Sequence, residues 1–207
     1  MRQPPDDRSL PAGLTDKLLR SWLRCRRKAW LDRHGPRELQ RWNAHRSLAL
    51  QEQLLRFQQL LPHKPSHGPQ ACQEGDQAVM GVRLRAPGPQ GLKVEAHPTL
   101  LVRVNSPSRW GGYSYRPVLA RQGRRTTREH RLLLALWGRL LSEHQKAPVP
   151  HGLVLAGQGG RLVQERLTLT PALDGQVDDS LVRLAEDLQR TTPPCLLYTS
   201  PSPRDRG

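Results

Sequence analysis

The first part of the chain spaces its apolar residues as helices do. A helix is predicted over residues 15–34, since Thr15 can cap its first turn and Gly35 follows its end. Basic residues cover most of its remaining faces, and its apolar stripe consists of Leu18, Trp22, Cys25 and Ala29. A second helical pattern covers residues 37–61. We therefore expect an N-terminal helical pair.

From residue 77 onward the spacing changes to the alternation that is typical of β-strands. Short strands are predicted at residues 77–85, 92–96, 99–105 and 113–121, with turn-forming sequences between them. Pro117 lies inside the last of these strands. Because proline cannot donate to a strand ladder, it favours an edge strand or a bulge.

The last part of the chain alternates between helices and strands. A leucine-rich helix is predicted at residues 126–144, capped by one of its first two threonines. Strands follow at 152–156 and 161–170, and a final helix is predicted at 179–190. This order of elements predicts an α/β fold, with a mixed, partly antiparallel sheet flanked by helices.

Charge adds a functional indication to this pattern. The 207 residues include 33 Lys and Arg against 18 Asp and Glu, which gives a formal net charge of +15. Arginine supplies 28 of these cations and lysine 5, and isoleucine is absent, so a GC-rich gene accounts for part of the skew. Because the arginine fork matches phosphate oxygens, the excess is also expected of a protein that contacts nucleic acid. Codon bias with solvated helix faces stays the alternative interpretation.

The apolar runs are short. None approaches the roughly 20 residues of a membrane-spanning helix, and the first residues contain no apolar segment of the signal-peptide type. We expect a cytoplasmic protein with no membrane partner.

Three segments differ in composition. Residues 1–13 are rich in Pro and Asp and are expected to form a disordered leader, whereas residues 14–194 form the domain. The tail, residues 195–207, reads CLLYTSPSPRDRG, and its stretch 195–205 is similar to one translated frame of a transposon-end adapter used in sequencing libraries. That similarity implies a truncated metagenomic reading frame whose natural sequence after residue 194 is missing.

Several motifs resemble those of the RecB-like nuclease family of the PD-(D/E)XK type. They are the segment LLRSWLRCRRKAWLDRHG at residues 18–35, a Tyr-x-Pro-Val strand, a basic loop, and the helix around LLLALWGRLL. The resemblance covers about residues 14–194 and extends to the iron–sulfur relatives of the CRISPR-associated exonuclease. It implies a restriction-endonuclease-like core.

The same resemblance gives Cys25 a role. In the iron–sulfur members, a cysteine at this position is the first ligand of a [4Fe–4S] cluster, and three more cysteines lie near the C-terminus. Such a cluster needs four thiolates, and before the tail this chain has only Cys72 besides, in a loop of sequence QACQEG. The resemblance thus implies a cluster in the full-length protein. The alternative is that Cys25 is a small buried residue of the helix stripe.

The family's metal site transfers poorly to this sequence. Its metal-binding Asp falls on Thr99 or, by a small shift of register, on His97, its acidic residue on Leu119, its lysine on Arg121, and its helix Gln on Leu133. Magnesium requires carboxylate and water oxygens, which Leu and Arg do not supply. The resemblance therefore implies a degenerate site. Mg²⁺ or Mn²⁺ binding is expected only if this alignment is wrong, with Glu95 and His97 as residual ligands.

A basic run separates the strand at 113–121 from the helix that follows. It consists of Arg121, Arg124, Arg125, Arg128 and Arg131. Its position at a helix N-terminus favours anions, and we expect it to contact phosphate. Trp110 and Tyr113 precede it and can stack on an unpaired base. A solvated basic face with two core aromatics is the alternative.

These patterns predict a degenerate RecB-like nuclease domain that binds nucleic acid, DNA rather than RNA, without an intact metal site. By resemblance it descends from nucleases, but its catalytic carboxylates and lysine are missing. One rival is an active divalent-metal-dependent DNA nuclease with an iron–sulfur cluster in the full-length protein. The other is a protein-interaction scaffold with no enzymatic role.

Overall fold

A computed structural model of the chain describes residues 13–36, 54–55, 57–59, 64–121, 125–158 and 161–194. The predicted leader up to residue 12 and the tail from residue 195 lie outside these residues. So does most of the second predicted helix at 37–61, of which residues 54–55 and 57–59 are helical.

Two mixed sheets form the centre of the fold. The larger has the strand order β2-β3-β6-β7-β8-β9, and the smaller has the order β1-β5-β4. The strands of the larger sheet are β2 (Ser66–His67), β3 (Ala78–Met80), β6 (Leu100–Val104), β7 (Ser114–Arg121), β8 (His151–Gln158) and β9 (Arg161–Thr168). Those of the smaller sheet are β1 (Leu14–Thr15), β4 (Leu84–Pro87) and β5 (Lys93–Ala96). The predicted mixed α/β fold is confirmed.

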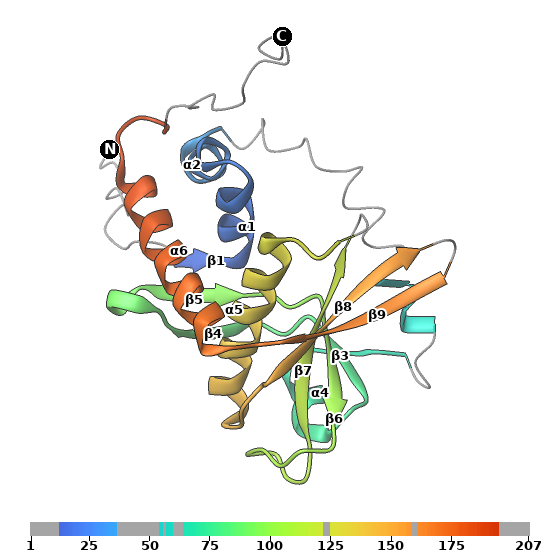
Figure 1. Ribbon diagram of the computed structural model, residues 1–207. Helices are drawn as coiled ribbons and strands as arrows, with labels where there is room; N and C mark the ends of the chain where they lie inside the picture. Colours follow the sequence, from blue (N-terminus) through green and yellow to red (C-terminus); the bar gives the residue numbers. More distant parts are fainter. Residues whose placement is uncertain are drawn as a thin grey trace, which may run out of the picture.

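Helices flank these sheets, as Figure 1 shows. They are α1 (Asp16–Arg24), α2 (Arg26–His34), α4 (Pro69–Glu74), α5 (Arg128–Gln145) and α6 (Pro171–Gln189), with one 3₁₀ turn, η2 (Pro89–Gly91). The connection between the parallel strands β7 and β8 is α5, which packs on β7, on both sheets and on α6. Within the described residues, no helix is long and apolar enough to cross a membrane.

The main core lies around α5. The helix begins at Thr127, whose Oγ1 accepts from the His130 amide, and it ends at Lys146 in the left-handed conformation (φ 53°). Its inward leucines, all at most 1% exposed, are Leu132, Leu133, Leu134, Leu136, Leu140 and Leu141. A second apolar cluster includes Val102, Val118, Leu153 and Leu155 of the larger sheet. The predicted leucine-rich helix and its threonine cap are confirmed.

The predicted helix at 15–34 is broken at one residue. Cys25 has extended backbone angles (φ −162°, ψ 114°), so it ends α1 and precedes α2. On either side of the break, Trp22 Nε1 donates to Asp187 Oδ2 at 2.8 Å and Trp30 Nε1 donates to the Arg190 carbonyl at 2.9 Å. The bend allows both indoles to reach the last turn of α6 and its C-cap. The N-terminal helical pair is therefore α1 and α2, both formed from this one segment.

The predicted strand at 77–85 is also two elements. Gly81 has a positive φ of 67°, a conformation that side chains disfavour, and the chain turns there from β3 in the larger sheet toward β4 in the smaller one. A strand pattern that continues across a glycine can thus belong to two different sheets. The last helix also starts earlier than predicted, because Thr170 caps it before Pro171.

The expectation that Pro117 marks an edge strand is wrong. It pairs with Leu101 of β6 in a strand that lies between β6 and β8. The register with β8 begins at Val118, one residue later, so Pro117 precedes the ladder to which its missing N–H would have contributed.

Candidate functional site

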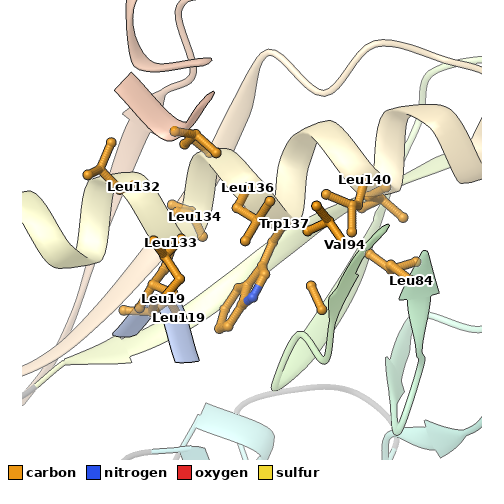
Figure 2. Close-up of a cluster of buried hydrophobic side chains, with 14 of the residues drawn as sticks. Leu19, Leu84, Val94, Leu119, Leu132, Leu133, Leu134, Leu136, Trp137 and Leu140 are labelled. Carbon is orange, nitrogen blue, oxygen red and sulfur yellow. The ribbon is translucent and has the colours of Figure 1, made fainter. Parts of the chain in front are cut away.

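The positions that correspond to the family's catalytic residues are packed with hydrocarbon. Leu119 of β7 and Leu133 of α5 are each 1% exposed and belong to the main core cluster together with Leu19 of α1. Figure 2 shows the three leucines within this cluster beside α5. The Thr99 hydroxyl donates to the Val118 carbonyl at 2.9 Å. Across the described residues, no group of three or more His, Cys, Asp or Glu side chains is placed to hold a metal ion.

Arg121 lies at the end of β7, where the family has its lysine. The residue is 7% exposed, and its Nη2 lies 3.8 Å from Glu165 Oε2 of β9. The same carboxylate oxygen accepts a hydrogen bond from the Thr126 hydroxyl at 2.5 Å. The guanidinium is thus part of a covered polar layer between β7, β9 and the start of α5.

Glu95 and His97, the expected residual ligands, belong to a network of ion pairs. Arg85 Nε donates to Glu95 Oε2 at 2.7 Å, and Arg83 Nε lies 3.3 Å from Oε1 of the same carboxylate. These arginines lower the pKa of Glu95, and the hydrogen bond from Arg85 is the largest cause. His97 Nε2 lies 3.2 Å from Glu95 Oε1. Neighbouring cations therefore already compensate the charge of Glu95.

Asp16 is a buried acid that sequence reasoning missed. It lies in the first turn of α1 and is 5% exposed. Its Oδ2 accepts from Trp137 Nε1 at 2.8 Å and from the His97 amide at 3.1 Å. This carboxylate joins α1, α5 and the residue after β5. Its position directly after the predicted cap Thr15 was the available signal, and an acid there is normally read as favourable to the helix dipole.

The two described cysteines lie in different parts of the fold. Cys72 is in α4 and not in the predicted loop; it is 1% exposed, and burial raises the pKa of its thiol to about 12. Cys25 is half-buried at the α1–α2 junction, far from α4 in Figure 1. A [4Fe–4S] cluster requires four thiolates. The thiols present in the described residues do not fit one.

A cavity of about 400 Å³ lies where the α1–α2 junction faces the start of α5 and the middle of α6. We call it the arginine pocket. It is lined by Trp22, Leu23, Arg24, Cys25, Arg26, Arg128, Asp179, Ser180 and Arg183. Four arginines face a single carboxylate, so the lining carries a net positive charge.

Two of these arginines are fixed by neighbouring acids. Arg24 donates through Nε and Nη2 to the two oxygens of Glu129, both at 2.6 Å. The Arg26 guanidinium lies 5.2 Å from the centre of the Trp22 ring, and its Nε lies 3.5 Å from Asp187 Oδ2. Asp187 is 3% exposed and also accepts from Trp22, so one buried carboxylate organises this wall.

The other two arginines have no such partner. Arg128 and Arg183 are exposed, and neither forms an ion pair or a side-chain hydrogen bond with the described part of the chain. Such guanidiniums keep their donors available for an incoming anion. The pocket therefore combines a rigid cationic wall with two available cations.

The predicted basic run is only partly represented here. Arg128 lines the pocket, whereas Arg125 and Arg131 are exposed outside its lining, and Arg124 lies outside the described residues. Sequence analysis placed Arg24 and Arg26 on a solvated helix face and did not single out Arg183. These residues come together only because α1 and α6, far apart in sequence, pack against each other.

The two aromatic residues of the preceding loop pack into the domain. Trp110 meets Tyr115 edge-on, with ring centroids 5.8 Å apart. The Tyr113 hydroxyl donates to the Gln73 carbonyl at 2.7 Å, and Arg103 covers its ring at 4.5 Å. These contacts favour the interpretation of both residues as core aromatics.

Comparison with known proteins gives a relative at the level of the fold. No family model matches the chain, and neither does any curated protein. The chain is similar to the crystal structure of SSO0001, with a TM-score of 0.56 and 14% identity over 89% of this chain and 80% of that chain. At this identity, the similarity shows a shared mixed α/β fold.

Proposed function

We propose that this domain binds DNA through its phosphate groups at the arginine pocket and does not cut it. The observation that carries the proposal is the lining of the pocket, with four arginines and one aspartate around about 400 Å³. The resemblance to RecB-like nucleases supports DNA as the ligand, and we place this binding in the cytoplasm.

Phosphodiester groups suit this pocket for two physical reasons. Guanidinium forks donate paired hydrogen bonds to phosphate oxygens. Arg24 and Arg26 are already held by Glu129 and by Asp187 with Trp22, so little side-chain freedom is lost when a phosphate arrives. Arg128 and Arg183 can then close on it from α5 and α6.

The pocket assignment is tested by salt-dependent binding of a fluorescent single-stranded oligonucleotide, measured by anisotropy. The double variant Arg128→Gln/Arg183→Gln should weaken binding and lower the slope of log affinity against log salt by roughly 2, about 1 for each lost phosphate contact. The control Lys93→Gln/Arg109→Gln removes the same charge from exposed residues outside the pocket. It should leave most of the slope intact. Equal losses in the two double variants would contradict the pocket assignment and favour diffuse charge attraction.

A second assay separates binding from cutting. The unmodified protein should leave single- and double-stranded DNA intact with Mg²⁺ or Mn²⁺, because the mapped ligand positions Leu119 and Leu133 are apolar. Metal-dependent cleavage that disappears in Glu95→Ala would overturn the non-cutting assignment and support an active site at Glu95 and His97. No DNA affinity above that of a charge-matched control protein would support the interaction-scaffold alternative.

A further inference from the structure

A second group of cations lies on the larger sheet, away from the arginine pocket. The register aligns Val118 of β7 with Leu153 of β8, and Leu153 with Arg166 of β9. Arg116 and His151 each lie two residues before Val118 and Leu153 on their strands. Because side chains two apart share a face, Arg116, His151 and Arg166 belong to the face that carries the second apolar cluster.

These three groups are close neighbours of like charge. Adjacent strands run about 4.8 Å apart, so residues on β7, β8 and β9 in this register lie side by side. Burial lowers the pKa of His151, and the charges of Arg166 and Arg116 lower it further. Burial together with the charge of Arg166 also lowers the pKa of Arg116. The neighbouring residues on the same face, Val102 of β6 and Val118, Leu153 and Gln164, are uncharged.

The cations lack a compensating partner in the part of the chain that the structure describes. None of the three forms an ion pair there, and the charges that act on His151 are both positive. Arg116 Nε and His151 Nδ1 are covered from solvent and have no hydrogen-bond partner among the described residues. Covered donors without acceptors are rare in folded proteins and call for a ligand.

We propose that Arg116, His151 and Arg166 form an oxyanion site for a phosphate group on the sheet face opposite α5. Two arginine forks and an imidazole can surround the oxygens of one phosphate, and its negative charge offsets their repulsion. The group belongs either to a nucleic-acid strand or to a small phosphorylated molecule. This site shares no residue with the arginine pocket, so it does not rest on DNA binding there.

The test is the titration of the histidine Cε1 protons by NMR on the full chain, with His151 assigned from His151→Gln. Inorganic phosphate, compared with chloride at equal ionic strength, should raise the pKa of His151 by about one pH unit, because a bound anion favours imidazolium. His144 is the internal control, since burial and Arg109 lower its pKa as well, but it lies in α5 outside the site. Its pKa should not respond.

Variants test the assignment of the cations. Arg166 is exposed, so Arg166→Gln should fold and should abolish most of the phosphate response of His151. Arg109→Gln should preserve that response, and so should Arg128→Gln/Arg183→Gln, which separates this site from the arginine pocket. A His151 pKa that ignores phosphate, an equal rise at His144, or a full response in Arg166→Gln would overturn the proposal.

A short oligothymidylate without terminal phosphate identifies the source of the phosphate group. If it raises the His151 pKa at lower concentration than inorganic phosphate, the site takes the backbone of a strand. If only inorganic phosphate acts, the site takes a small phosphorylated molecule.

Discussion

The same two helices build two regions of opposite character. Toward the sheet, α1 and α5 contribute Leu19 and Leu133, which pack with Leu119 of β7 in a core that excludes water. At the adjoining helix ends, α1 contributes Arg24 and α5 contributes Arg128 to the arginine pocket. One region has hydrocarbon where the related nucleases have ligands for a metal, and the other has cations suited to phosphate.

The difference separates two tasks that nucleases combine. Cutting requires oxygens that hold a metal, and those positions are filled by leucines whose burial stabilises the fold. Holding a strand requires only cations on a rigid frame, and Glu129 and Asp187 provide that frame for Arg24 and Arg26. On our proposal, binding persists because it depends on residues that contribute little to the core.

The largest expected effect is on the apolar region. Leu133→Ala should lower the free energy of unfolding by about 2–5 kcal/mol, because it leaves a cavity beside Leu19 and Leu119. Urea denaturation followed by circular dichroism measures this change. The control Leu31→Ala alters a leucine that is 42% exposed on α2 and should change stability by less than about 0.5 kcal/mol. Little loss from Leu133→Ala would show that this position behaves as a site and not as core.

A smaller effect is expected from the frame of the arginine pocket. Asp187→Ala should cost about 1–3 kcal/mol, since it leaves the buried Trp22 N–H without an acceptor. Asp187→Asn keeps an acceptor oxygen and should retain more of the stability. Thermal unfolding of both variants, with DNA affinity measured in parallel, checks this order. If alanine and asparagine destabilise equally, the hydrogen bond to Trp22 is not what Asp187 contributes.

The limits of the sequence prediction follow the same division. The apolar spacing predicted α5, β6 and β7 to within a few residues and correctly indicated leucines at 119 and 133, because burial is written in local periodicity. The break at Cys25 carries no glycine or proline. It depends on contacts of Trp22 and Trp30 with α6 and its C-cap, which local spacing does not record.

The candidate site was harder to predict because it joins distant segments. Arg183 lies on the last helix and faces Arg24 and Arg26 only after α1 and α6 have packed. Arg121 looked equivalent to Arg128 in the basic run, yet one is covered and the other lines the pocket. Charge runs indicate a kind of partner, but tertiary packing decides which cations can reach it.

The start of α5 links the two regions and should respond to pH. His130 Nδ1 accepts a hydrogen bond from the Thr127 amide at 3.1 Å, which a protonated ring cannot do. Burial lowers the pKa of His130, and nearby arginines add to this. The unfolded chain therefore takes up this proton first, and stability should fall as pH drops below about 6.5 until the folded pKa is reached.

His130→Gln isolates this contribution. Glutamine at this position can accept from the capping amide without titrating, so the variant should lose less stability on acidification than the unmodified protein. Urea midpoints at neutral and mildly acidic pH measure the difference. His144 and His151 titrate in both proteins, so parallel pH profiles would mean that His130 is not a source of the acid sensitivity.

The smallest expected effect on stability comes from the two available arginines. Arg128→Gln and Arg183→Gln should each change the free energy of unfolding by less than about 0.5 kcal/mol, because neither exposed side chain has an ion-pair partner among the described residues. Denaturation and DNA anisotropy on the same samples test this against Leu133→Ala, which should lose stability without a matched loss of affinity per folded molecule. Stability loss without affinity loss in the arginine variants would make these side chains structural and would remove the basis for the proposed binding site. The opposite result would locate binding at the helix ends and stability at the leucines, on the same pair of helices.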